Sequence, residues 1–154
     1  MKIEIIALDL EGTLISNAIS QIPRPHLYEF LEGCKAITEH VVMFTTVREE
    51  KFRQIARLLV SESVVPDWFE RMEYVEWDGH KKDLRFINDC NIESTFLVDD
   101  VEAYVMDDQK DRWLEIEQFA SPYSDSDTEL VSMLQRLQKR VITLSNAKCA
   151  RHYN

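Results

Sequence analysis

Basic residues are scarce in this sequence. Lys and Arg together number 18 against 28 Asp and Glu, so the 154-residue chain carries a formal net charge of −10. We therefore expect no nucleic-acid partner, because binding a duplex needs clustered Lys and Arg for its phosphates. A basic or a phosphorylated partner fits this charge better, although net charge by itself mainly favours solubility.

Long apolar runs are missing and cysteines are few. No stretch approaches the length of a membrane span, and Glu4 interrupts the short apolar run at the start, so neither a span nor a signal peptide is expected. The three cysteines, Cys34, Cys90 and Cys149, are odd in number and widely spaced. This pattern argues against a disulfide framework or a zinc site and fits a reducing, cytoplasmic location.

Internal repeats, linkers and low-complexity segments are absent as well. The length is typical of one domain, and 45% apolar residues are enough for a core. We therefore expect a single domain over residues 1–144, followed by a polar, frayed tail over residues 145–154.

Apolar patterning predicts alternating strands and helices. Short runs rich in β-branched or aromatic residues predict strands, and apolar residues at helical spacing predict helices. The expected strands cover residues 3–8, 41–45 and 94–100, with a further short strand within 111–119. The expected helices cover residues 24–37 (opened by Pro25), 48–60, 81–89 and 124–144. Residues 61–80 are less regular and predict loops with a small hairpin or short strands.

This order favours βαβ units. Strands that alternate with helices form a mostly parallel sheet with helices on both faces. We therefore predict an α/β, Rossmann-like fold.

Polar residues gather at the ends of the three main strands. The first strand is followed by Asp9, Glu11, Gly12 and Thr13, the second ends in Thr45 and Thr46, and the third ends in Asp99 and Asp100. Between the last two strands, Lys81 and Lys82 stand at the start of an expected helix. Because ligands bind at the carboxyl ends of parallel strands, these side chains are expected to converge. Acids that close repel one another unless a cation lies among them, and an oxygen-only set suits Mg²⁺.

The motifs resemble those of the haloacid dehalogenase superfamily. DLEGT, FTT, a lysine and VDD follow one another in the order of that superfamily's motifs. About thirty residues separate Thr13 from Thr45, and about thirty-six separate Thr46 from Lys82. Neither gap has room for a cap domain.

A narrower resemblance is to the small C-terminal-domain phosphatase group, also called NLI-interacting-factor-like. PRPHLYEFLEGC and VVMFTT are similar to the group's RPGL-x-EFL and VIFTAS, KKDL to its VKDL, LVDD to its ILDN, and SDTEL to its DTEL. The resemblance runs from about residue 3 to about residue 140. Each motif is weak alone, but five in the right order are strong. The group's substrates are often phosphorylated Ser or Thr in a protein segment, and an uncapped site equally admits a small phosphomonoester.

The resemblance implies roles for four catalytic residues. Asp9 would be the nucleophile that takes the phosphoryl group as an aspartyl-phosphate. Glu11 would stand at the general acid/base position. Thr45 would hydrogen-bond the transferring phosphoryl group, with Thr46 as the alternative. Lys82, rather than Lys81, would neutralise its charge and hold Asp9.

The resemblance also implies a Mg²⁺ site. Asp9, Asp99 and the backbone carbonyl of Glu11 would bind the ion, and Asp100 would assist directly or through water. A nucleophilic carboxylate and a phosphate are both anions, so their approach needs a cation and a lysine to cancel the repulsion.

Glu11 departs from the group's pattern, which has Asp at this position. Its side chain is longer by about 1.5 Å, and misplacements of about 1 Å can cost roughly 10²-fold in rate. Enolase-phosphatases of the same superfamily have a similar D-x-E-G-T and are active, although they carry a cap. Three readings follow: an active or weak phosphatase, a non-catalytic protein-binding module in which Glu11 marks lost catalysis, and a phosphotransferase.

Two further features allow more than one interpretation. The aromatic residues Trp68, Phe69, Tyr74 and Trp77 either line a groove for a peptide or pack in the core, which is the commoner role. Arg48 follows the second motif and is either a phosphate contact or an ordinary surface charge of a helix.

Overall fold

Five parallel strands form the centre of the molecule. The computed structural model describes residues 2–151, with side chains described over residues 2–143. The strands are β1 (Ile5–Leu8), β2 (His40–Met43), β3 (Glu73–Tyr74), β4 (Thr95–Asp99) and β5 (Trp113–Glu115). Their order across the sheet is β3-β2-β1-β4-β5, and every neighbouring pair is parallel. The predicted α/β, Rossmann-like fold is confirmed, and the described residues contain no second domain that would act as a cap.

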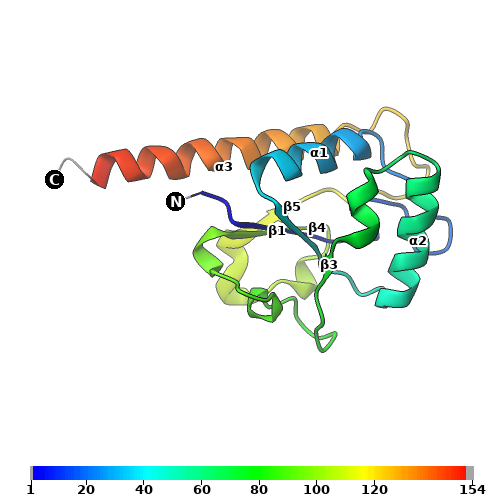
Figure 1. Cartoon of the computed structure of the whole chain (residues 1–154), viewed down its shortest axis with the longest axis horizontal. Helices are drawn as coiled ribbons and strands as arrows, with labels where there is room; N and C mark the ends of the chain where they lie inside the picture. The colour runs from blue at the N-terminus through cyan, green and yellow to red at the C-terminus, as the bar shows by residue number, and fades with distance from the viewer. Residues whose placement is uncertain (1, 152–154) are drawn as a thin grey trace.

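Three α-helices build the core on one side of the sheet. They are α1 (Leu27–Ile37), α2 (Glu49–Ser61) and α3 (Glu129–Arg151). Their apolar faces share one buried cluster with sheet residues such as Ile6, Val41 and Phe96. In Figure 1, α1 and α3 lie along each other above the sheet.

The opposite side of the sheet is covered differently. Its smaller buried cluster includes Ala7, Val42 and Leu97 and is closed by loops and 3₁₀-helices rather than by α-helices (Figure 1). These 3₁₀-helices are Leu84–Phe86, Ile92–Ser94, Glu102–Tyr104 and Asp107–Arg112, while Asp67–Arg71 packs against α2. The burial of this cluster therefore depends on short 3₁₀-helices, and some of their backbone N–H groups bond to residues in other segments.

The predicted helix over residues 81–89 is reduced to the 3₁₀-helix Leu84–Phe86. The backbone N–H of Lys82 donates to the Tyr104 carbonyl at 2.7 Å, and that of Leu84 donates to the Gln109 side chain at 2.9 Å. These two N–H groups are committed to partners outside the segment and cannot build a longer helix. The commitment fixes the backbone at Lys82.

Two other helices differ from their expected bounds. The α1 helix begins at Leu27, after a left-handed residue, His26 (φ 68°), and not at Pro25. The α3 helix begins at Glu129, later than residue 124, and continues to Arg151 through the segment predicted to be a frayed tail. In the irregular region, β3 pairs in parallel with β2, so it is a short edge strand and not part of a hairpin.

Candidate active site

The acids of the first and third motifs meet at the carboxyl ends of β1 and β4. Asp9 follows β1 directly and continues the pairing, since its N–H donates to the Val98 carbonyl at 3.0 Å. Asp99 is the last residue of β4, and Asp100 comes next. The chain runs from β1 to β2 on one side and later returns to β4 on the other, so the site lies where the strand order reverses.

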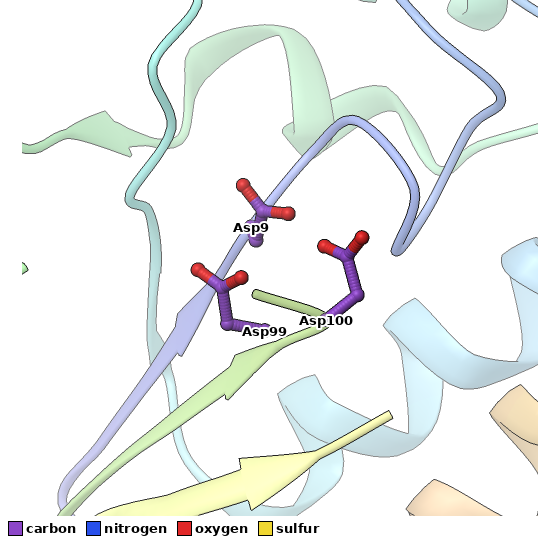
Figure 2. A group of neighbouring side chains, drawn as sticks. All are labelled: Asp9, Asp99 and Asp100. Atoms are coloured by element: carbon purple, nitrogen blue, oxygen red, sulfur yellow. The ribbon is translucent and has the colours of Figure 1, made fainter. Parts of the chain in front are cut away.

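Three carboxylates point toward one another at this edge (Figure 2). One oxygen from each of Asp9, Asp99 and Asp100 lies within 4.8 Å of the others. Asp9 is only 6% exposed and Asp99 is fully buried. Burial raises the pKa of Asp99 to about 6, helped by the charge of Asp9 and opposed by Lys82. Burial, with Asp9 beside it, also raises the pKa of Asp100 to about 7.

The cluster fits a hard divalent cation. Its donors are all carboxylate oxygens, the ligand type that Mg²⁺ prefers. The raised pKa values of Asp99 and Asp100 record the free energy cost of holding like charges together in a buried place. A bound dication removes that cost. Asp9, Asp99 and Asp100 are therefore the residues that would hold Mg²⁺.

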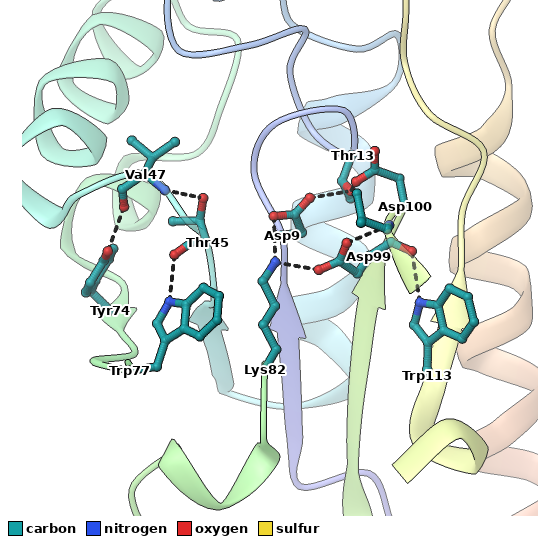
Figure 3. A network of polar contacts seen from close by, with 11 residues as sticks. Asp9, Thr13, Thr45, Val47, Tyr74, Trp77, Lys82, Asp99, Asp100 and Trp113 are labelled. Atoms are coloured by element: carbon teal, nitrogen blue, oxygen red, sulfur yellow. Dashed lines mark hydrogen bonds and ion pairs between the residues drawn. The ribbon is translucent and has the colours of Figure 1, made fainter. Parts of the chain in front are cut away.

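Lys82 lies against the buried side of the cluster. Its Nζ is 2.8 Å from Asp9 Oδ1 and forms a second ion pair with Asp99 (Figure 3). Only 1% of the residue is exposed. Burial alone would lower the pKa of this ammonium, but the charges of Asp9 and Asp99 outweigh burial and raise it. Lys81, the alternative in the sequence, is exposed and donates to the Ala103 carbonyl at 2.8 Å.

Three aromatic rings surround the Lys82 ammonium. Its Nζ lies 5.5 Å from the ring centroid of Tyr104 and 6.0 Å from those of Phe44 and Trp77. The rings exclude water and attract the cation through their faces. Lys82 is thus held in one position, charged and directed at Asp9.

Thr13 joins two of the acids. Its hydroxyl lies 3.0 Å from Asp9 Oδ2 and 3.2 Å from Asp100 Oδ1 (Figure 3). A hydroxyl has one proton to donate, so it cannot serve both oxygens at once. The two contacts together place the Thr13 hydroxyl between Asp9 and Asp100. No role for the Thr13 side chain was predicted from the sequence.

Gly12 allows the loop to pass close to Asp100. Its φ is +73°, a backbone region that other residues enter at a cost. A Cβ on Gly12 would lie 2.4 Å from Asp100 Oδ2, which is too close for any side chain. The glycine of the first motif is therefore required both by the turn and by the position of the third acid.

Glu11 lies near the three carboxylates of Asp9, Asp99 and Asp100 but is not part of their cluster. Its side chain is half-buried, and its Oε2 accepts the N–H of Ala18 at 2.7 Å. This bond crosses the loop that follows the motif, and a bridge between Glu11 and Ile15 closes the loop further. The other oxygen, Oε1, makes no hydrogen bond with the described part of the chain. It is the oxygen that remains available to carry a proton.

Thr45 ends the second strand as a buried residue. Its hydroxyl accepts the N–H of Val47 at 3.1 Å, and its carbonyl accepts the indole N–H of Trp77 at 2.9 Å (Figure 3). The hydroxyl of Tyr74 donates to the Val47 carbonyl at 2.6 Å and holds the same turn. Thr46 is exposed. Thr45 thus fixes the backbone here, and Thr46 offers its side chain to the surface.

Two cavities open beside these groups. The carboxylate cavity, of about 300 Å³, is lined by residues that include Asp9, Glu11, Asp99 and Asp100. A second cavity of about 480 Å³, called the side cavity below, is lined in part by Thr45, Arg48, Tyr74 and Trp77. Both cavities share Thr46 and Tyr104 as lining residues, so they are neighbours. Trp68 and Phe69 line neither, since Trp68 bonds to Glu32 and Phe69 packs on Phe52.

Arg24 is a structural residue that the sequence did not reveal. Its fully buried guanidinium makes a two-pronged ion pair with Asp127, with both N–O distances at 3.0 Å. It also donates to the carbonyls of Thr13 at 3.1 Å and Glu117 at 2.7 Å. The motif loop is thereby tied to the segment before α3. The two partners lie in motifs that the sequence analysis singled out, Arg24 in RPH and Asp127 in SDTEL, but nothing in either motif alone indicates that they pair.

Comparison with known protein families gives a match. A family model described as NLI interacting factor-like phosphatase matches residues 4–148, nearly the whole chain. Comparison with curated proteins gives no match. Within the described residues, every helix is too short or too polar to cross a bilayer.

Proposed function

The chain belongs to the NLI interacting factor-like phosphatase family, and from this membership we propose that it is a Mg²⁺-dependent phosphomonoesterase working through an aspartyl-phosphate on Asp9. The substrate would be a phosphorylated protein segment or a small phosphomonoester, since residues 2–151 form no cap over the site. We also propose a cytoplasmic location, because the few and widely spaced cysteines suit a reducing compartment.

One observation carries the proposal. The carboxylate of Asp9 is buried and is held on one side by Lys82 Nζ at 2.8 Å and on the other by Thr13 Oγ1 at 3.0 Å. Two bonds fix the carboxylate in one orientation at the mouth of the cavity. A positioned nucleophile next to a buried cation is what an attack on a phosphate dianion requires.

The reaction would proceed in two steps. A carboxylate oxygen of Asp9 attacks phosphorus, the bond to the ester oxygen breaks, and Glu11 gives its proton to that leaving oxygen. Glu11 then takes a proton from water, and the water oxygen attacks the aspartyl-phosphate and releases inorganic phosphate. Lys82 compensates the negative charge throughout. Mg²⁺ held by Asp9, Asp99, Asp100 and the backbone carbonyl of Glu11 would supply further charge neutralisation for the phosphoryl oxygens.

Glu11 would use the carboxyl oxygen that is not bound to the loop. Its Oε2 is occupied by the Ala18 N–H at 2.7 Å, so Oε1 is the atom that would exchange the proton. The extra methylene of Glu lets one carboxylate reach the loop and the cavity together. We expect Glu11→Asp to lower kcat because the shorter side chain loses the bond that orients it.

Hydrolysis of para-nitrophenyl phosphate tests the proposal. The protein is assayed with and without Mg²⁺ between pH 5 and 8, beside Asp9→Asn and Glu11→Asp. Metal-dependent turnover that disappears in Asp9→Asn is the expected result. Turnover that persists in Asp9→Asn would refute the aspartyl-phosphate route.

The hydrogen bond from Ala18 to Glu11 also favours a second candidate, a protein-binding module with weak or no catalysis. If this bond holds the Glu11 carboxyl group away from the leaving oxygen, the other site residues could still bind a phosphate, but no acid would protonate the leaving group. The same assay separates the two candidates. No turnover in the parent protein together with turnover in the Glu11→Asp variant would support the binding module.

A further inference from the structure

The side cavity is the direct continuation of the proposed phosphoryl site. It shares Thr46 and Tyr104 with the carboxylate cavity. Its volume of about 480 Å³ is large enough for one or two amino-acid side chains. A phosphate ester bound at Asp9 has its leaving group on the open side of the site. The leaving group would therefore lie next to the side cavity.

The charge of the side cavity is predominantly negative. It is lined by one cation, Arg48, and by three acids, Glu49, Glu76 and Asp78. All four side chains are exposed to solvent. Burial raises the pKa of the neighbouring Tyr74, and the charges of Glu76 and Glu49 raise it further against the opposing charge of Lys82. The field in this cavity therefore repels anions and attracts cations.

The acids are largely free to receive a ligand. Glu76 makes no hydrogen bond or ion pair with the described residues, and Glu49 makes only a long contact of 3.4 Å with Arg53. Asp78 accepts a single backbone N–H, that of His80, at 2.9 Å. Each carboxylate retains acceptor positions for a cationic group.

The cavity also has a rigid aromatic wall. The indole of Trp77 is fixed by its hydrogen bond to the Thr45 carbonyl. It also makes edge-to-face contacts with Phe44 and Tyr104, with ring centroids 5.5 Å and 5.9 Å apart. The Tyr74 hydroxyl is anchored on Val47 at 2.6 Å. Aromatic faces beside carboxylates attract the alkyl stem and the charged head of Lys or Arg.

We propose that the side cavity selects phosphorylated peptide segments with Lys or Arg next to the phosphorylated residue. The proposal rests on the proposed function and names its substrate class. A peptide fits better than a small cationic ester because the three acids lie on exposed positions around an open cavity, and no cap formed by the described residues encloses a small molecule. The net charge of −10 adds a general attraction for basic segments.

Three phosphoserine peptides test this selectivity: one flanked by Arg, one by Ala and one by Glu. We expect kcat/KM to be roughly tenfold higher for the Arg peptide than for the Glu peptide at low salt, as two or three exposed charge pairs would give. The ratio should fall at 0.5 M NaCl because salt screens exposed charges. Phosphocholine and phosphoethanolamine serve as the small cationic competitors.

Charge-removing variants locate the effect. The double variant Glu76→Gln/Asp78→Asn should bring the Arg-to-Glu ratio close to one. The matched control Glu62→Gln/Asp89→Asn removes the same charge from exposed positions that line neither cavity, and it should keep the ratio. Equal losses in both variants would assign the preference to net charge and overturn the role of the cavity.

Binding measured without turnover separates this inference from the proposed function. Fluorescence anisotropy with labelled peptides and the Asp9→Asn protein reports the preference when chemistry is blocked. A preference for Arg there, with no hydrolysis by the parent, would refute the phosphatase and keep the side cavity as a basic-peptide site. Hydrolysis of para-nitrophenyl phosphate without any preference for Arg, or with faster hydrolysis of phosphocholine, would refute the inference alone.

Discussion

Replacing Arg24 with methionine should lower the free energy of unfolding by about 3 kcal/mol. The structure provides the reasons for this magnitude. Methionine fills most of the volume of Arg24 but leaves Asp127 without its cation and the carbonyls of Thr13 and Glu117 without a donor. Breaking a buried ion pair from one side costs about 3–5 kcal/mol. The lower end applies because the Asp127 side chain is 14% exposed and can take up water.

Urea unfolding followed by circular dichroism measures the effect, and thermal unfolding should show a loss of roughly 6–12 °C for a chain of this size. Arg57→Met is the matched control, because Arg57 is exposed on α2, and its change should stay within about 0.5 kcal/mol. Asp127→Asn and the double variant complete a cycle. The double variant should be destabilised by less than the sum of the two single variants, since either change alone breaks the pair. A loss below about 1 kcal/mol in Arg24→Met, or strict additivity, would refute the claim that this pair holds the motif loop.

Three further predictions concern the site itself. Gly12→Ala should weaken Mg²⁺ binding measured by calorimetry, since its Cβ would collide with Asp100 Oδ2, whereas an unchanged Kd would show that Asp100 contributes little. Lys82→Met should lower kcat roughly 10²- to 10³-fold, as loss of one charge-stabilising donor does elsewhere, and a smaller change in the para-nitrophenyl phosphate assay would contradict the assigned role. Without Mg²⁺, stability should fall as pH rises from about 4 to about 7, because Asp99 (pKa about 6) and Asp100 (pKa about 7) bind protons more tightly in the folded than in the unfolded chain. Added Mg²⁺ should therefore raise Tm more at pH 8 than at pH 5, and Asp100→Asn should reduce that difference; an equal rise at both pH values would count against the raised pKa values.

Much of the fold follows from sequence patterns because buried parallel strands have a simple signal. The apolar runs that end at Leu8, Phe44 and Val98 are continuous and short, and each is followed by a polar residue. Since the carboxyl ends of parallel strands share one edge, the meeting of Asp9 with Asp99 follows from topology, whereas Lys82 reaches both acids from a segment outside the strands.

What the sequence did not predict depends on contacts between distant segments. Arg24 looks like a surface charge until Asp127 and the loop carbonyls are brought around it. The helix expected at residues 81–89 fails because Tyr104 and Gln109 take the N–H groups of Lys82 and Leu84. Similarly, no periodic pattern marks a strand of two residues such as β3, which exists only because β2 lies beside it. The orientation of Glu11 toward Ala18 also depends on loop geometry that residue types do not specify.

The central position of β1 has a consequence for biosynthesis. This strand is made first, yet its partner β4 pairs with it from Ile5 opposite Thr95 to Leu8 opposite Val98. At about 5–20 residues per second, roughly 5–20 s pass between the synthesis of Ile5 and that of Thr95. During this interval one edge of an apolar strand has no partner within the nascent chain, and such edges pair readily with other chains. Newly made protein is therefore most exposed to aggregation, and most dependent on chaperones, before residue 99 leaves the ribosome.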